Sequence, residues 1–132
     1  MLETTSKSGP RILRTAQSIA IADAFLEPWP LEPQSIVSGN PEASGSVLSR
    51  SDGGRAIRGL WACTPGEFRW VWTYDETLVV SQGSATVVLE DGEIDLYPGV
   101  FAFFERGQSS VWRIKTPFRK GFHALSHEPL AF

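Results

Sequence analysis

Short apolar runs alternate with turn-forming residues from Ala56 onward. Segments rich in Val, Ile, Leu, Phe and Trp recur about every ten residues, which is typical of an antiparallel sandwich or barrel. The sharpest turn signal is Asp91-Gly92, where both residues are expected at positive φ between two strands. The predicted strands are 56–63, 68–74, 76–82, 84–90, 93–97, 100–104, 109–115 and 118–125. The pattern therefore predicts an all-β domain.

The first 35 residues differ from the rest and predict an arm beside this domain. Three prolines between residues 28 and 33 force an extended path around Trp29. The segment 15–26 fits either a short helix or a strand, because its apolar residues satisfy both periodicities. We divide the chain into an N-terminal arm, residues 1–35, and one β-barrel, residues 36–132.

Alternate residues of a strand share a face, and one face of the predicted strand 68–74 is wholly aromatic. The same register continues to a carboxylate, Glu76. On the last two strands, the same argument turns Trp112 and Lys120 inward and leaves arginines outside, in solvent or at an interface. These outward arginines are Arg69, Arg113 and Arg119. The residues predicted to face inward are Phe68, Trp70, Trp72, Tyr74, Glu76, Leu78, Val80, Ser110, Trp112, Ile114, Phe118, Lys120 and Phe122.

Composition and charge exclude several classes of protein. The chain has 132 residues, and its 12 basic and 15 acidic side chains are mixed along it, without the basic stripe that nucleic acid requires. No apolar run approaches the roughly 18 residues that span a bilayer, and the start lacks the features of a secretory signal. We expect a cytoplasmic protein without a nucleic-acid or membrane partner. Cys63, the single cysteine, is expected in the core, and His123 and His127 at the surface or a dimer contact.

The spacing of one glutamate and three glycines resembles the motifs of the cupin superfamily. Glu76 precedes Gly83 by the interval of the first motif, and Gly99 and Gly107 match the glycines of the second. The chain is similar to small single-domain cupins grouped with the cupin domain of ureidoglycine aminohydrolase. Further stretches that carry this similarity are 38–41, 59–68, 75–76, Trp112 and 118–120. The resemblance implies an RmlC-like cupin, a double-stranded β-helix or jelly-roll barrel.

The residues at the metal-binding positions of this family are unusual. A metal-binding cupin of the family type holds its ion with three histidines and a glutamate. Here Trp70, Trp72 and Ser110 stand in the histidine places, and Glu76 alone remains. An indole has no lone pair for a metal, and a serine hydroxyl is a poor neutral ligand. We therefore expect no metal and no cofactor.

Glu76 is predicted to pair with Lys120, because a lone carboxylate among tryptophans would be desolvated without a cation. The pair is either a structural tie across the barrel or a functional dyad. The preferred function is metal-independent binding of a small molecule inside the barrel. The candidate catalytic residues are Glu76, Lys120 and Tyr74, and the candidate ligand-binding residues are Trp70, Trp72, Trp112 and Ser110.

Two other functions stay open on the sequence. The first, implied by the resemblance, is a hydrolase, lyase or isomerase of a small metabolite that uses Glu76 as acid or base. The second is a structural or regulatory dimer whose barrel is plugged by indole rings. A homodimer is expected in each case, since small cupins commonly pair through sheet edges. The arm around Trp29 is suited to covering such an edge or a neighbouring subunit.

Overall fold

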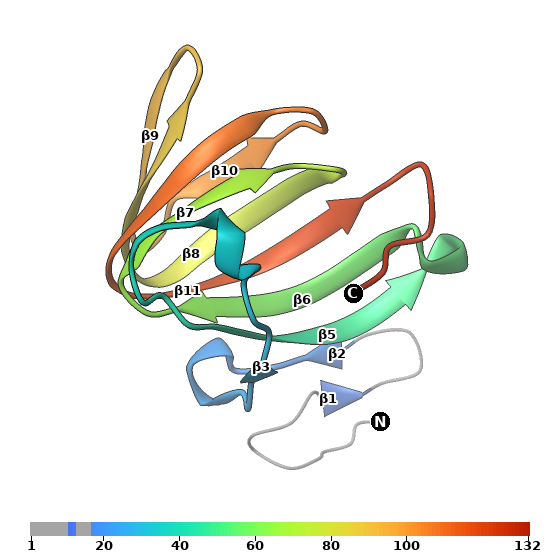
Figure 1. The fold of residues 1–132 in the computed structure, drawn as a ribbon. Helices are drawn as coiled ribbons and strands as arrows, with labels where there is room; N and C mark the ends of the chain where they lie inside the picture. The colour runs from blue at the N-terminus through green and yellow to red at the C-terminus, as the bar shows by residue number, and fades with distance from the viewer. Residues whose placement is uncertain (1–10, 13–16) are drawn as a thin grey trace.

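A curled β-sheet makes up most of the protein (Figure 1). The computed structural model describes residues 11–12 and 17–132. No helix in this part of the chain has the length and apolar character needed to cross a membrane. The strands are β1 (Arg11–Ile12), β2 (Gln17–Ser18), β3 (Glu27–Pro28), β4 (Ile36–Gly39), β5 (Ala43–Ser51), β6 (Ala56–Cys63), β7 (Gly66–Val71), β8 (Asp75–Leu89), β9 (Gly92–Leu96), β10 (Phe101–Phe104) and β11 (Ser109–Leu125), and the 3-10 turns are η1 (Ile21–Asp23), η2 (Pro33–Ser35) and η3 (Asp52–Gly54).

Two long strands, β8 and β11, form the spine of the nine-stranded sheet. They pair antiparallel along nearly their whole length. The other edge of β8 pairs with β10 and then with β9, and the other edge of β11 pairs with β7 and then with β6. Strands β5 and β3 extend the sheet beyond β6. Because each long strand serves two groups of partners, the sheet bends into two halves whose inner faces meet.

The bend coincides with turn signals that the sequence placed between strands. Breaks were predicted at Gly83 and at Thr116-Pro117, yet β8 and β11 each run through them as one strand. The β8–β11 register shifts between residues 114 and 120. Gly83, opposite this region, has φ +81°, and a Cβ on it would collide with the backbone of Pro117. The turn signals therefore mark a β-bulge-like irregularity. Such an irregularity bends the two paired strands without ending them.

The remaining strands divide into those the pattern predicted and those it did not. Strand β6 has the predicted bounds, 56–63. Strands β4 and β5 were not predicted. Strand β5 lacks the apolar pattern of a strand, because it consists largely of Ser, Gly and Ala. Pairing with the apolar strand β6 holds this polar segment in the sheet. Its β-structure thus depends on its neighbour more than on its own composition.

The β8–β9 hairpin lies where Asp91-Gly92 predicted it, with its loop one residue earlier. Leu89 pairs with Gly92, so Glu90 and Asp91 form the two-residue loop. The prediction that both Asp91 and Gly92 take positive φ was wrong, since Asp91 does not. The turn signal therefore located the hairpin correctly and placed its two-residue loop one residue too late.

The described part of the arm packs on the edge of its own barrel. Strand β3 pairs with β5, and the Trp29 amide donates to the Ala43 carbonyl at 2.9 Å. Gly45 lies against the Trp29 indole, and a Cβ there would overlap the ring. The glycine therefore allows the arm to approach the sheet closely.

A second contact holds the arm where the sequence left its conformation open. Residues 21–23 form the single turn η1, and residues 13–16 lie outside the described residues. Arg119, expected in solvent or at an interface, instead donates to the carbonyls of Ile21 and Ala24 at 2.5 and 3.3 Å. Its guanidinium anchors the arm to the outer face of β11.

The predicted inward face is confirmed. The even-numbered residues are buried or half-buried from Phe68 through Val80 and from Ser110 through Lys120, except for the exposed Thr116. The core residues of the two halves include Cys63, Phe68, Trp72, Tyr74, Leu78, Val80, Val87, Leu96, Phe104, Trp112, Ile114 and Phe118. Arg69 and Arg113 lie outside as expected. Strand parity therefore identified the side of the sheet on which the site lies.

Candidate functional site

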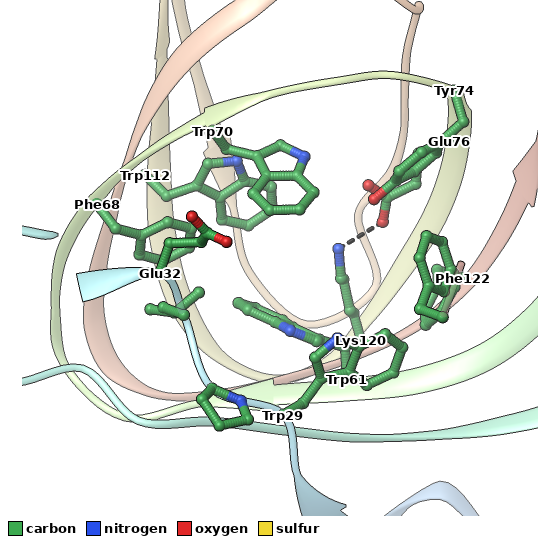
Figure 2. Close-up of a pocket in the computed structure, with 13 residues that line it drawn as sticks. Trp29, Glu32, Trp61, Phe68, Trp70, Tyr74, Glu76, Trp112, Lys120 and Phe122 are labelled. Carbon is green, nitrogen blue, oxygen red and sulfur yellow. Dashed lines mark hydrogen bonds and ion pairs between the residues drawn. The ribbon is translucent and has the colours of Figure 1, made fainter. Parts of the chain in front are cut away.

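A cavity of about 410 Å³ opens among the inward-facing side chains (Figure 2). We call its exposed or half-buried border the rim, its half-buried sides the wall, and its buried end the base. The rim is Trp29, Pro30, Leu31, Glu32 and Phe132. The wall is Trp61, Trp70 and Phe122. The base is Phe68, Tyr74, Glu76, Trp112 and Lys120.

Glu76 and Lys120 form an ion pair at the base, as the sequence predicted. Lys120 Nζ donates to Glu76 Oε2, and the two residues are only 6% and 3% exposed. Glu76 comes from β8 and Lys120 from the neighbouring strand β11, so the paired spine of the sheet sets their separation. Figure 2 shows the lysine extending across the cavity toward the carboxylate.

Aromatic rings surround the Lys120 ammonium. Its Nζ lies 4.8 Å from the Trp61 ring centroid, 4.9 Å from that of Trp112 and 5.7 Å from that of Phe122. At these distances the negative faces of the rings attract the cation. Glu76 and the three rings together stabilise a charge that burial alone would make costly.

Trp72 supports Glu76 from behind the cavity. Its Nε1 donates to Glu76 Oε1 at 2.9 Å, so both oxygens of the carboxylate are occupied by N–H donors. Trp72 is 1% exposed and stacks on Phe104 with ring centroids 4.3 Å apart. It does not line the cavity. The structure therefore places the Trp72 indole in the core, and not on the lining where a ligand-binding residue was predicted.

Ser110 also lies outside the cavity lining. Its buried hydroxyl donates to the Trp70 carbonyl at 2.9 Å, which ties β11 to β7. The structure thus brings five of the seven predicted site residues to the cavity and assigns Trp72 and Ser110 to its support.

Tyr74 and Trp112 add polar groups to the base. Burial, reinforced by the charge of Glu76 and opposed by the Trp70 indole, raises the pKa of Tyr74 well above its usual value. The phenol therefore stays neutral and keeps its O–H as a donor. Trp112 Nε1 is buried without a hydrogen-bond partner among the described residues. The base consequently holds donors in excess of free acceptors.

Several cavity residues were not predicted as site residues. Trp61 pairs directly with Lys120 across the β6–β11 ladder, and the parity of strand 56–63 would have identified it once that pairing was known. Trp29 and Phe132 lie outside the paired barrel strands, where no alternation indicates a face. Their rings are 5.4 Å apart at the rim.

The residues at the metal-binding positions of a cupin do not fit a metal ion. Tryptophan or serine occupies three of the places, and both oxygens of Glu76 already accept hydrogen bonds. Across residues 11–12 and 17–132, no three His, Cys, Asp or Glu side chains cluster as metal ligands would. His127 is exposed and lies 2.8 Å from Arg106 Nη1, away from the cavity lining. The donor set instead suits an ammonium group, which Lys120 supplies.

Cys63 is expected to be unreactive in the folded protein. Burial raises its pKa from 9.0 to about 12, with the nearby Lys120 charge opposing the shift. The folded protein then holds about a thousandfold less thiolate near pH 8 than the unfolded chain. We expect Ellman's reagent to react promptly with the protein in guanidinium and negligibly with the native protein at pH 8.

The same shift gives a pH dependence with a definite sign. Because the folded pKa of Cys63 lies above the unfolded value, this thiol's contribution to stability is complete below pH 9 and is lost between pH 9 and 12. Urea unfolding should show a smaller loss above pH 9 in Cys63→Ala than in the wild type. An equal loss would contradict the assignment, as would fast labelling of the native thiol.

The sequence of the barrel assigns the chain to a known family. Residues 50–122, more than half of the chain, match the EutQ-like cupin domain. The chain therefore belongs to the EutQ-like cupin domain family, and its all-β RmlC-like fold agrees with that membership. No curated protein matches the sequence.

Solved structures with the same fold include two EutQ proteins, one of which is described as putative. The Clostridium difficile EutQ protein is 13% identical with a TM-score of 0.72, covering 94% of this chain and 98% of its own. A putative ethanolamine utilization protein Q from Salmonella typhimurium LT2 is 17% identical with a TM-score of 0.70, covering 93% and 100%. A protein of unknown function from Pseudomonas syringae pv. tomato is 21% identical with a TM-score of 0.74, covering 84% and 48%. At these identities the likeness shows the fold alone, and the narrower relation to ureidoglycine aminohydrolase stays a prediction.

Proposed function

We propose that the protein binds a small, flat organic molecule in its barrel without a metal ion. The observation that carries the proposal is an open cavity of about 410 Å³ directly beside a buried ion pair. Its volume lies in the roughly 300–1,000 Å³ range of small-molecule pockets. Apolar walls with a few convergent polar groups are likewise the usual make-up of such pockets.

The polar groups of the base favour a ligand that accepts hydrogen bonds. An ammonium has three N–H donors, and Glu76 takes one from Lys120. Tyr74 adds a phenolic donor, whereas both Glu76 oxygens are already occupied. The aromatic faces of Trp61 and Trp70 suit a flat apolar body. The combination fits an aromatic or planar molecule with a carbonyl oxygen directed at the base.

The cavity also weighs against the plugged barrel. Buried indoles do fill part of the interior, since Trp72 and Trp112 are almost fully enclosed. Trp61 and Trp70, however, remain half-buried and border open space. A barrel sealed by its own tryptophans would leave no such space, so the binding function is the better supported of the two.

Saturation-transfer NMR with benzamide and toluene tests the proposal. Both probes are flat, and only benzamide carries the carbonyl. We expect a stronger signal for benzamide, and a clear loss of it in Trp70→Ala. Phe103→Ala serves as the matched control, because Phe103 is an exposed aromatic outside the cavity lining. Equal signals for the two probes, or equal loss in the two variants, would contradict the proposal.

Elemental analysis of protein purified without chelator tests the proposal that no metal ion is bound. A near-stoichiometric metal content would overturn it.

A further inference from the structure

Lys120 differs in its surroundings from Lys115, the other lysine among the described residues. The chain has three lysines, at positions 7, 115 and 120, and Lys7 lies outside the described residues. Lys115 is exposed on the same strand, β11. Lys120 lines the cavity, enclosed by aromatic rings and in contact with one carboxylate. Desolvation in an apolar pocket is one of the settings in which lysine acts as a nucleophile in other proteins.

A lysine attacks an electrophile only as the free amine, and the cavity provides a route to it. In water the ammonium would have to release its proton to solvent. Here the Glu76 carboxylate is in direct hydrogen-bond contact with Nζ and can take the proton. The transfer converts two buried charges into a neutral amine and a neutral acid, and the desolvation cost that it removes offsets the ion-pair attraction that is given up.

We propose that Lys120 forms an imine with an aldehyde or ketone that enters the cavity. The inference rests on the proposed function, since the carbonyl compound must first bind there. After Glu76 takes one proton, the Nζ lone pair forms a bond to the carbonyl carbon, and the carbonyl π pair moves to oxygen. A proton passes from nitrogen to that oxygen to give the carbinolamine. Glu76 then returns its proton to the hydroxyl, the C–O bond breaks, and water leaves.

The product keeps the charge pattern of the starting site. An ammonium and a carbonyl compound become a protonated imine and water, so one positive charge stays at Nζ and Glu76 is again a carboxylate. The same rings that surround the ammonium, Trp61 and Trp112, then face the iminium cation. Tyr74, at the same base, offers a neutral O–H to the carbonyl oxygen. Cys63 is no competitor, because it is buried outside the cavity lining.

Reductive trapping tests the proposal on the intact wild-type protein. The protein is incubated near neutral pH with benzaldehyde and cyanoborohydride, which reduces an imine to a stable benzyl amine. Intact mass and peptide mapping then locate the benzyl group. We expect Lys120 to be labelled at least about tenfold faster than the exposed Lys115. Benzamide, which occupies the cavity but forms no imine, should slow labelling of Lys120 and leave Lys115 unchanged.

Variants separate the roles of the pair. Lys120→Arg keeps the cation and should abolish the cavity label, and Lys115→Arg should leave it intact. Glu76→Gln should bring labelling of Lys120 down to the rate of Lys115, with circular dichroism confirming that the variant is folded. If benzamide binds and Lys120 is labelled no faster than Lys115, the imine is wrong and the binding function stands. If benzamide does not bind and gives no protection, both are overturned.

Discussion

Replacing Lys120 with methionine should lower the free energy of unfolding by about 3–5 kcal/mol, because the substitution leaves a buried carboxylate without its cation. Methionine fills much of the space of the lysine side chain, so the loss comes mainly from the charge of Glu76. Urea unfolding monitored by tryptophan fluorescence measures it. The direction of the effect does not depend on whether the site binds a ligand.

Two controls isolate the charge from the packing at this position. Lys115→Met removes an exposed lysine from the same strand and should change stability by less than about 0.5 kcal/mol. The double variant Glu76→Gln/Lys120→Met removes both charges, and it should recover most of the stability lost by Lys120→Met alone. A double variant as unstable as the single one would show that packing, and not an unpaired charge, is responsible.

Replacing Trp72 with alanine should lower the free energy of unfolding by a similar amount, about 3–5 kcal/mol, for a different reason. The indole is fully buried against Phe104, so its removal leaves a cavity in the core. Trp72→Phe keeps a ring there and loses the hydrogen bond to Glu76, for which we expect about 1.5–3 kcal/mol. Both values come from urea unfolding.

Trp70 provides the matched comparison, two residues away on the same alternating face. It is half-buried and borders the cavity, so Trp70→Ala should destabilise the protein less than Trp72→Ala and reduce benzamide binding. Trp72→Phe should keep most of that binding, because Trp72 does not line the cavity. Equal destabilisation by the two alanine variants would contradict the division into a wall residue and a support residue.

Strand parity carried most of what the sequence could predict. The period of two put Glu76, Trp112 and Lys120 on one face, and their burial beside one another confirms it. The spacing of Glu76 and Gly83 predicted the cupin fold, which the family match and the solved structures support. The homodimer and the cytoplasmic location expected from the sequence stay predictions.

Depth within the barrel could not be predicted from parity. Trp70 and Trp72 share a face, yet one borders the cavity and the other lies in the core, because the chain leaves strand β7 between them. The sequence pattern also could not predict which residues from distant, non-strand segments reach the cavity. Phe132 reaches the rim through a tail with no periodicity, held by the Leu130 amide on the Gly54 carbonyl at 2.9 Å. Such contacts depend on the whole fold.

The segments that form the rim are expected to open more readily than the strands of the barrel. Trp29 and Phe132 belong to segments outside the long paired strands, and a few backbone hydrogen bonds hold each segment in place. Segments of this kind open locally at a small fraction of the free energy of global unfolding. We therefore expect exchange of molecules between solvent and the cavity to depend on the fluctuations of these two segments more than on the stability of the sheet.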